Sequence, residues 1–461
     1  MVATALKAHF DNSRFMGTAI VSAILIFILG GIVFLMNGKI PLAFVYFGIP
    51  FLIVIISYPR AAIYLYIFSL FIFICLSSNP PLMLIDIAAL MFLASFGVDF
   101  LLKGKTFLRV PSIVKYGLVL LTTLVFATLF AHHPEYSYGP IVRVSLQLAI
   151  VLAIYNLISG KDALIMLKTY FWLMVLHSLY NFITFVMLKG EYRIFGLPGV
   201  YFDDLAILAF PIGLAYFIWS ERQGESLRYG LGTILIIFGL LATHSRGPVL
   251  TIAWVGLALV IYSRRKALMG GVNNVRSRLR MIFLAIIPVL LIFIGFSGIF
   301  RFALERLQTL ENIDTGTIWM RFFLWKASLT AFLSSPFTGI GPGNFRYIES
   351  ILPALKFDEA ALYVHRLSAH NMFLHYLAES GIIGAAALVT LYLKNFMTAK
   401  NIAKHNPPCF PRAFSMALFG VGLTIFATIF YMDGWAWGQN AFAAPLFFAI
   451  IAKVANCGTD A

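Results

Sequence analysis

The side chains best suited to chemistry are histidines and arginines near residue 370. His370 and Asn371 open an apolar segment, and His365 and Arg366 come just before them. An imidazole can accept a proton near neutral pH. If this segment is helical, Arg366 lies one turn before His370, and its charge favours the neutral imidazole that accepts a proton. We therefore consider His370 a candidate general base.

Helical geometry separates His370 from the next acidic residue. His370 and Glu379 are nine positions apart, which is about 900° at ~100° per residue and places them on opposite faces. His375 and Glu379 are four positions apart and can pair within the helix. The spacing of His365, His370 and His375 fits no metal-binding pattern such as HExxH. We expect neither a His370–Glu379 dyad nor a metal site.

Two further arginines lie in loops that glycines interrupt. Arg246 precedes Gly247 and Pro248, and Arg193 lies in a loop with three glycines. Arginine is the side chain best suited to bidentate phosphate binding. A second interpretation of Arg246 is that it extends to the lipid headgroups.

An acidic pair, Asp203 and Asp204, begins the apolar segment between these two arginines. Carboxylates at this position usually cap a helix and complement its dipole. A general base or a contact to an acceptor sugar is the alternative.

The stretch 301–371 is the longest polar insertion in the chain. Within it, residues 317–335 carry regularly spaced aromatic residues together with Arg321, which predicts a helix along the membrane surface. The segment Pro336–Phe345, here called the glycine turn, follows. A glycine-rich turn alone is a weak indication of phosphate binding, and this one is neither a P-loop nor a dinucleotide fingerprint.

The composition shows what kind of protein must position these side chains. Of 461 residues, 61% are hydrophobic and 11% are charged, against ~45–50% and ~25% in soluble domains. So few polar groups cannot cover a soluble surface, which excludes a soluble enzyme, a disordered chain and a disulfide-rich scaffold. Continuous apolar runs such as Met281–Phe300 also disfavour a membrane β-barrel, whose strands alternate.

The apolar runs predict an all-α, polytopic membrane protein with about 12–14 transmembrane helices. We place the spans near residues 16–36, 40–57, 61–77, 82–102, 116–131, 141–159, 163–188, 205–219, 229–244, 249–262, 281–300, 372–396, 414–432 and 441–455. The chain then has three parts: an N-terminal transmembrane bundle (1–300), a loop with amphipathic helices (301–371) and C-terminal transmembrane helices (372–461).

The net charge of +15 indicates the orientation of these spans. With a cytoplasmic N-terminus, 22 of the 34 Lys and Arg residues fall on the cytoplasmic side. Only five fall in short outer loops, and long loops such as 301–371 do not enter the positive-inside rule. We expect both termini in the cytoplasm and the candidate residues on the opposite face. The basic residues form scattered loop clusters, so no nucleic-acid partner is expected.

Several short motifs, in this order, resemble the O-antigen ligase and O-antigen polymerase superfamily. The resemblance covers about residues 190–385. The motifs are Thr243-x-Ser245-Arg246-Gly247, Arg321-x3-Trp325, Pro336-x2-Gly339-x-Gly341-x-Gly343-x-Phe345 and His370-Asn371-x2-Leu374-x4-Glu379-x-Gly381-x2-Gly384.

The resemblance implies a GT-C-like membrane glycosyltransferase in the bacterial inner membrane. Such enzymes transfer a glycan from undecaprenyl pyrophosphate at the periplasmic face, with no metal or other cofactor. In the ligases the acceptor is lipid A–core oligosaccharide, and in the polymerases it is another lipid-linked repeat unit.

The resemblance also implies roles for individual residues. His370 matches the histidine that activates the acceptor hydroxyl. Arg246 and Arg193 match the arginines that hold the donor pyrophosphate, and Arg321 assists them. We group His365, Arg366 and Asn371 with them as candidate substrate-binding residues.

Two alternatives to a ligase stay open. A polymerase would use the same residues, although a long outer loop with an aromatic helix suits a lipid-anchored lipid A–core acceptor. A transporter or flippase of lipid-linked sugars would also have many spans and buried arginines. Transporter sites usually lie near the membrane midplane on broken helices. The candidate residues here cluster on one face of the membrane, which favours an enzyme. Membrane lipids are expected around it.

Overall fold

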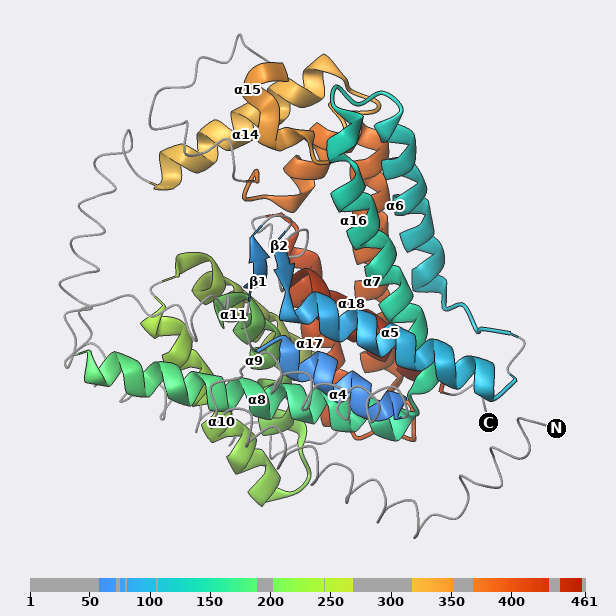
Figure 1. Cartoon of the computed structure of the whole chain (residues 1–461). Helices are drawn as coiled ribbons and strands as arrows, with labels where there is room; N and C mark the ends of the chain where they lie inside the picture. Colours follow the sequence, from blue (N-terminus) through green and yellow to red (C-terminus); the bar gives the residue numbers. More distant parts are fainter. Residues whose placement is uncertain are drawn as a thin grey trace, which may run out of the picture. The chain divides into compact units, whose positions relative to one another are not determined.

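Helices make up most of the structure, a computed structural model shown in Figure 1. It describes residues 58–71, 75–78, 81–104, 107–188, 202–243, 245–267, 317–351, 368–430 and 440–457. The chain divides into two compact units. One comprises Met1–Ser69 and Cys75–Leu108, and the other comprises Leu70–Ile74 and Arg109–Ala461.

The first unit contains a helix pair and a short hairpin. Its elements are α4 (Pro59–Ser69), β1 (Cys75–Ser78), β2 (Pro81–Met83) and α5 (Leu84–Leu102). The two strands pair antiparallel, and Tyr66 of α4 stacks on Phe92 of α5 with ring centroids 6.2 Å apart.

The hairpin corrects one expected span. The sequence predicts a helix over 61–77, but α4 ends at Ser69, and residues from Cys75 onward form a strand. The Ser69 hydroxyl donates to the Tyr66 carbonyl at 2.7 Å, a local bond that competes with continuation of the helix. The sequence Asn79-Pro80 that follows favours a turn.

The second unit is a helical bundle with an additional helical segment, α14 to α15. Its elements are α6 (Ser112–Thr128), η1 (Pro134–Tyr136), α7 (Tyr138–Leu157), α8 (Gly160–Met187), α9 (Phe202–Trp219), α10 (Gln223–Ala242), α11 (Arg246–Ala267), α14 (Thr317–Ser334), η3 (Asn344–Tyr347), α15 (Ile348–Ile351), α16 (Met372–His405), α17 (Arg412–Thr428) and α18 (Asn440–Ala455).

These helices confirm a polytopic membrane protein. Six of the described helices are long and apolar enough to cross a membrane, and four shorter ones are also apolar. They coincide with the expected spans from 82–102 to 249–262 and from 372–396 to 441–455. The expected spans at 16–36, 40–57 and 281–300 lie outside the described residues.

Helix α9 forms the centre of the second unit. It packs against α8, α10, α11 and α17, and 83% of its apolar window is buried. Small residues permit the close packing: a Cβ on Gly213 would overlap Thr233, and a Cβ on Gly420 would meet Pro211 at 2.5 Å. Close backbone approach at small residues is the usual way in which helices associate in membranes.

Candidate functional site

The glycine turn is hydrogen-bonded to a break in α16. Gly381 lies inside α16 with φ 64° and ψ −166°, so the helix stops and restarts there. The break frees carbonyl groups of the preceding turn of the helix, and the Ile340 N–H donates to the carbonyl of Ala378 at 2.9 Å. After the break, the Ile382 N–H donates to the carbonyl of Pro336 at 2.9 Å. The turn and the helix therefore position each other.

Glycine is required at the points of closest approach. Gly339 and Gly381 both have positive φ, 68° and 64°. A Cβ on Gly339 would overlap the backbone of Glu379, and a Cβ on Gly381 would overlap the carbonyl of Phe337. Both the left-handed conformation and the close packing therefore exclude larger side chains.

The backbone of the glycine turn is used for packing. Five of its N–H groups donate to acceptors within the chain. They belong to Gly339, Ile340, Gly341, Asn344 and Phe345. Donors engaged in this way cannot also surround a phosphate group. The glycine-rich sequence thus serves to attach the turn to α16.

Glu379 fixes the end of the turn from inside the protein. One carboxylate oxygen accepts the N–H of Phe345 at 3.0 Å, and the other lies 3.3 Å from Nε2 of His375. The expected pairing of His375 with Glu379 is therefore confirmed. Both carboxylate oxygens are engaged within the turn and the helix, which makes Glu379 a positioning residue for the turn.

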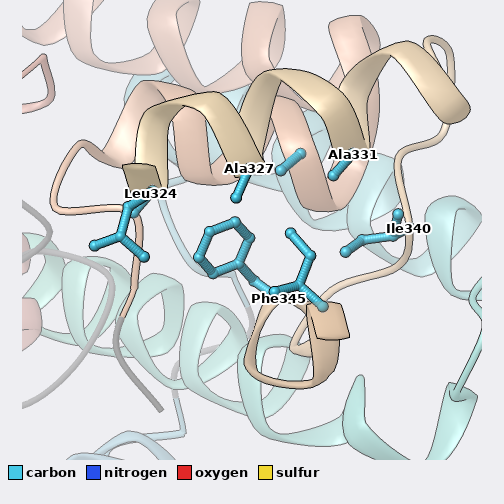
Figure 2. Packing of buried hydrophobic residues seen from close by; sticks show 8 residues of the cluster. Leu324, Ala327, Ala331, Ile340 and Phe345 are labelled. Carbon is cyan, nitrogen blue, oxygen red and sulfur yellow. The ribbon is translucent and has the colours of Figure 1, made fainter. Parts of the chain in front are cut away.

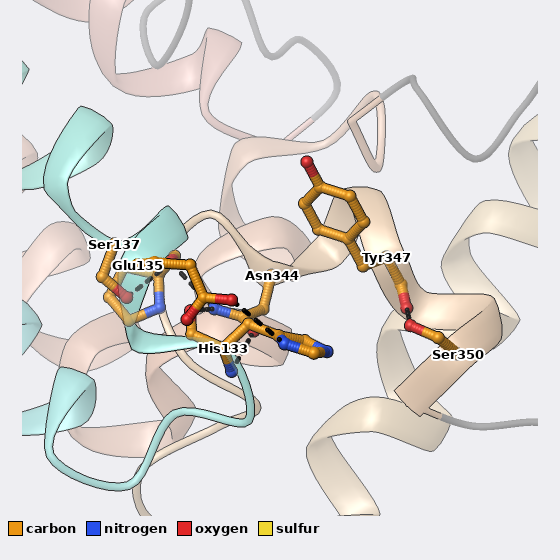
Figure 3. Close-up of polar contacts among 7 residues, drawn as sticks. His133, Glu135, Ser137, Asn344, Tyr347 and Ser350 are labelled. Atoms are coloured by element: carbon orange, nitrogen blue, oxygen red, sulfur yellow. Dashed lines mark hydrogen bonds and ion pairs between the residues drawn. The ribbon is translucent and has the colours of Figure 1, made fainter.

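Asn344 joins the glycine turn to the loop before α7. Its side-chain oxygen accepts the N–H of His133 at 2.9 Å, and its amide nitrogen donates to the carbonyls of His133 and Pro342, each at 3.1 Å. The Ser137 hydroxyl donates to the same Pro342 carbonyl at 2.9 Å. Figure 3 shows this connection between η1 and η3. Asn344 is the unspecified position between Gly343 and Phe345 in the sequence motif. Only its position next to Gly343 could have indicated this role.

Replacing Asn344 by alanine should loosen the glycine turn. The substitution leaves the partly buried N–H of His133 without its acceptor, and the loss of a typical intramolecular hydrogen bond costs about 0.5–1.5 kcal/mol. We expect a lower apparent Tm in detergent and faster proteolysis between α14 and α16. Asn401→Ala, at an exposed position of α16, is the control, and equal Tm values for the two variants would contradict this role.

Asn371 caps the N-terminus of α16 and ties it to the end of α17. Its side-chain oxygen accepts the N–H of Leu374 at 3.0 Å, and its amide nitrogen donates to the carbonyl of Phe430 at 2.5 Å. The N–H of Phe373 adds a bond to the carbonyl of Ile429 at 2.9 Å. Both ends of the amide thus have backbone partners, and substrate binding by Asn371 stays a prediction.

His370 directly precedes this cap in an unusual conformation. Its φ is 49°, one of two positive values among the described non-glycine residues. Left-handed conformations are rare outside glycine, although histidine is among the residues enriched there. His370 is partly exposed and follows the fully buried Ala369. The neighbouring buried residue helps to keep His370 in this conformation at the start of α16, and such conformations are frequent at functional sites.

A hydrophobic cluster packs α14, the helix that contains Arg321, against the glycine turn and Ala369. Figure 2 shows α14 packed over the glycine turn. Leu324 lies one turn after Arg321, Ala369 lies next to His370, and both belong to this cluster. Arg321 itself is exposed. The complete cluster consists of Leu324, Ala327, Ala331, Ile340, Phe345, Ile348, Ala369 and Ala378.

The acidic pair at the start of α9 is connected to the Ser-Arg-Gly turn. The Ser245 hydroxyl donates to Asp203 at 2.6 Å, and Arg246 is the first residue of α11. Asp203 and Asp204 both lie in the first turn of α9, and Asp204 is buried. The sequence gives no indication of this bond, because its two residues are 42 positions apart.

Aromatic side chains are exposed next to the Asn344 connection. The rings of Tyr136 and Tyr347 stack with centroids 3.9 Å apart, and each residue is more than one-third exposed. His133 and Glu135 lie beside them, and Nδ1 of His133 is 3.3 Å from a carboxylate oxygen of Glu135. Apolar ring faces bordered by polar groups are suited to contact with sugar rings.

The remaining candidates stay predictions. Arg193, His365 and Arg366 lie outside the residues that the structure describes. Over the described part of the chain, no group of three or more His, Cys, Asp or Glu side chains could hold a metal ion.

Comparison with known families finds a similarity that covers this region. Residues 231–389 match a family model described as O-Antigen ligase. Over these residues the chain is similar to the O-antigen ligase family. No curated protein matches the chain. The matched residues extend from α10 into α16 and include Arg246, Arg321, the glycine turn and His370.

Proposed function

We propose that the protein is a GT-C-like O-antigen ligase. It transfers an O-antigen glycan from undecaprenyl pyrophosphate to lipid A–core oligosaccharide, without a metal ion. It resides in the bacterial inner membrane with both termini in the cytoplasm, and its reaction takes place at the periplasmic face. This topology follows from the distribution of basic residues between the two sides.

The observation that supports the proposal is the position of His370 within the residues that match the O-antigen ligase family. The imidazole stands at the cap of α16 with an enforced backbone conformation. Ala369, next to this cap, belongs to the hydrophobic cluster that α14 forms with the glycine turn. A residue held so firmly, at the boundary of an apolar helix, is suited to act on a substrate that a lipid presents at the membrane surface.

The chemistry needs one base and a group that stabilises the leaving pyrophosphate. The acceptor hydroxyl oxygen attacks the anomeric carbon while the bond from that carbon to the pyrophosphate oxygen breaks. The hydroxyl proton passes to His370, and the configuration at the anomeric carbon inverts. Arg246, Arg193 and Arg321 stabilise the negative charge that grows on the pyrophosphate. His365, Arg366 and Asn371 contribute to the substrate site.

A purified transfer assay tests the proposal. The protein in detergent is given lipid-linked O-antigen and lipid A–core, and the expected product is lipid A–core that carries O-antigen. A transporter or flippase forms no product in detergent, where no compartments exist, so absence of product would overturn the proposal. Product formed only between two lipid-linked repeat units would identify a polymerase.

Deletion of the gene provides the corresponding test in cells. Loss of a ligase leaves lipopolysaccharide without any O-chain. Loss of a polymerase leaves core that carries a single repeat unit. The second pattern would contradict the proposed ligase activity.

Arg321→Ala is expected to weaken use of the donor. Charge-assisted hydrogen bonds contribute about 1.5–3 kcal/mol, so kcat/KM for the lipid-linked donor should fall roughly 10- to 100-fold. Arg321→Lys should lose less, because it keeps the charge but not the bidentate geometry. Lys326→Ala, at an exposed position of α14, is the matched control. Equal kinetics for Arg321→Ala and Lys326→Ala would remove Arg321 from the donor site.

A further inference from the structure

A polar pocket lies at the end of α6 opposite to the glycine turn. It is a small, open pocket between α6, α16 and α18. Helix α6 has 17 residues, about 25 Å at ~1.5 Å per residue, and Ala131, just beyond its C-terminus, contacts Gly341 of the glycine turn. The polar residues that line the pocket are Ser112, Tyr116, Lys394, Asn395, Thr398 and Asn456, and none of its lining residues is acidic.

The side chain of Asn395 has unused hydrogen-bonding capacity. Asn395 lines the pocket and is only 2% exposed. Its amide nitrogen has no hydrogen-bond partner. A buried donor without a partner is unfavourable, so a ligand acceptor in the pocket would stabilise the protein.

Positive charge and a helix N-terminus meet at the same pocket. Lys394 lies with its ammonium group 5.6 Å from the centre of the Tyr116 ring, which leaves its N–H donors available to an anion. Helix α6 begins here after Pro111, and no side chain caps its first turn. The uncapped end contributes partial positive charge and free N–H groups, the usual elements of an anion site.

We propose that this pocket binds the phosphate group of an anionic membrane lipid. The Lys394 ammonium, the Asn395 amide and the first turn of α6 hold the phosphate oxygens. Basic pockets between helices at a membrane boundary are suited to acidic lipid headgroups. On α16, the helix that carries Lys394 and Asn395, the exposed apolar side chains of Leu393 and Met397 offer a surface for the acyl chains. This site is separate from the candidate active site and does not depend on the proposed glycosyl transfer.

Lipid retention measured by native mass spectrometry tests the site. The purified full chain is mixed with phosphatidylglycerol and phosphatidylcholine in detergent, and we expect it to retain phosphatidylglycerol preferentially. One basic residue near a membrane surface contributes ~1 kcal/mol, so Lys394→Gln should weaken retention about fivefold. Asn395→Leu should weaken it as well. The matched control is Lys400→Gln, which removes an exposed charge of α16 outside the pocket.

The outcomes separate the two sources of phosphate. Loss of retention in the Lys394 and Asn395 variants but not in Lys400→Gln supports the site. A rise in apparent Tm with inorganic phosphate, absent in Lys394→Gln, shows that free phosphate uses the same groups. Equal retention by Lys394→Gln and Lys400→Gln, or no preference for phosphatidylglycerol, overturns the proposal. Apparent Tm without added lipid confirms that each variant is folded.

Discussion

Replacing His370 by asparagine is expected to reduce kcat for glycan transfer about 10²- to 10⁴-fold, the usual contribution of a general base. Asparagine is a suitable replacement because it also tolerates the left-handed conformation that His370 adopts. The variant therefore removes the proton acceptor while the chain still enters α16 in the same way. Steady-state kinetics with lipid-linked donor and lipid A–core in detergent provide the measurement.

The control for this prediction is a histidine on the same helix. His405→Asn, at the exposed C-terminal end of α16, should keep the activity of the unchanged protein. Binding of the lipid-linked donor and apparent Tm should be nearly the same in both variants, because a base acts in the transition state. Full activity of His370→Asn would show that another group takes the proton.

Hydrophobic pattern alone predicted most of the helices. Continuous apolar runs in a membrane protein leave the backbone little choice but to form helices, because every N–H and C=O must be satisfied within the segment. The pairing of His375 with Glu379 was predictable for a similar reason, since positions four apart are neighbours on any helix. The end of α4 was not predictable from the apolar pattern. That pattern continues past Ser69, whereas the hydroxyl bond of Ser69 and the short hairpin end the helix there.

The candidate site was predictable as a list of residues but not as an arrangement. The sequence places His370, Arg321 and the glycine turn in one region, yet gives no indication that α16 breaks at Gly381 or that the turn bonds to that break. Contacts such as Asn344 with His133 join segments 211 positions apart, and no local pattern encodes them. The glycine-rich motif, alone a weak indication of phosphate binding, has five of its N–H groups hydrogen-bonded within the chain.

Gly381→Ala is expected to detach the glycine turn from α16. At φ 64° and ψ −166° Gly381 lies in a region that essentially only glycine occupies, and another residue there costs roughly 1–3 kcal/mol. The new Cβ would also overlap the carbonyl of Phe337. Relief of that overlap requires the turn to move away, which breaks its bonds to the helix. We expect a clear fall in apparent Tm and loss of transfer activity, because the cap that carries His370 belongs to the same assembly.

A second glycine separates this effect from a general response to substitution. A Cβ on Gly139, in the first turn of α7, would meet no other atom within 4 Å, so Gly139→Ala should leave the apparent Tm unchanged or raise it slightly. If Gly381→Ala instead straightened α16 without harm, the activity and Tm of both variants would agree. The break would then be a tolerated irregularity. A loss confined to Gly381→Ala means that the conformation of one glycine, eleven positions after His370, holds the candidate base in place.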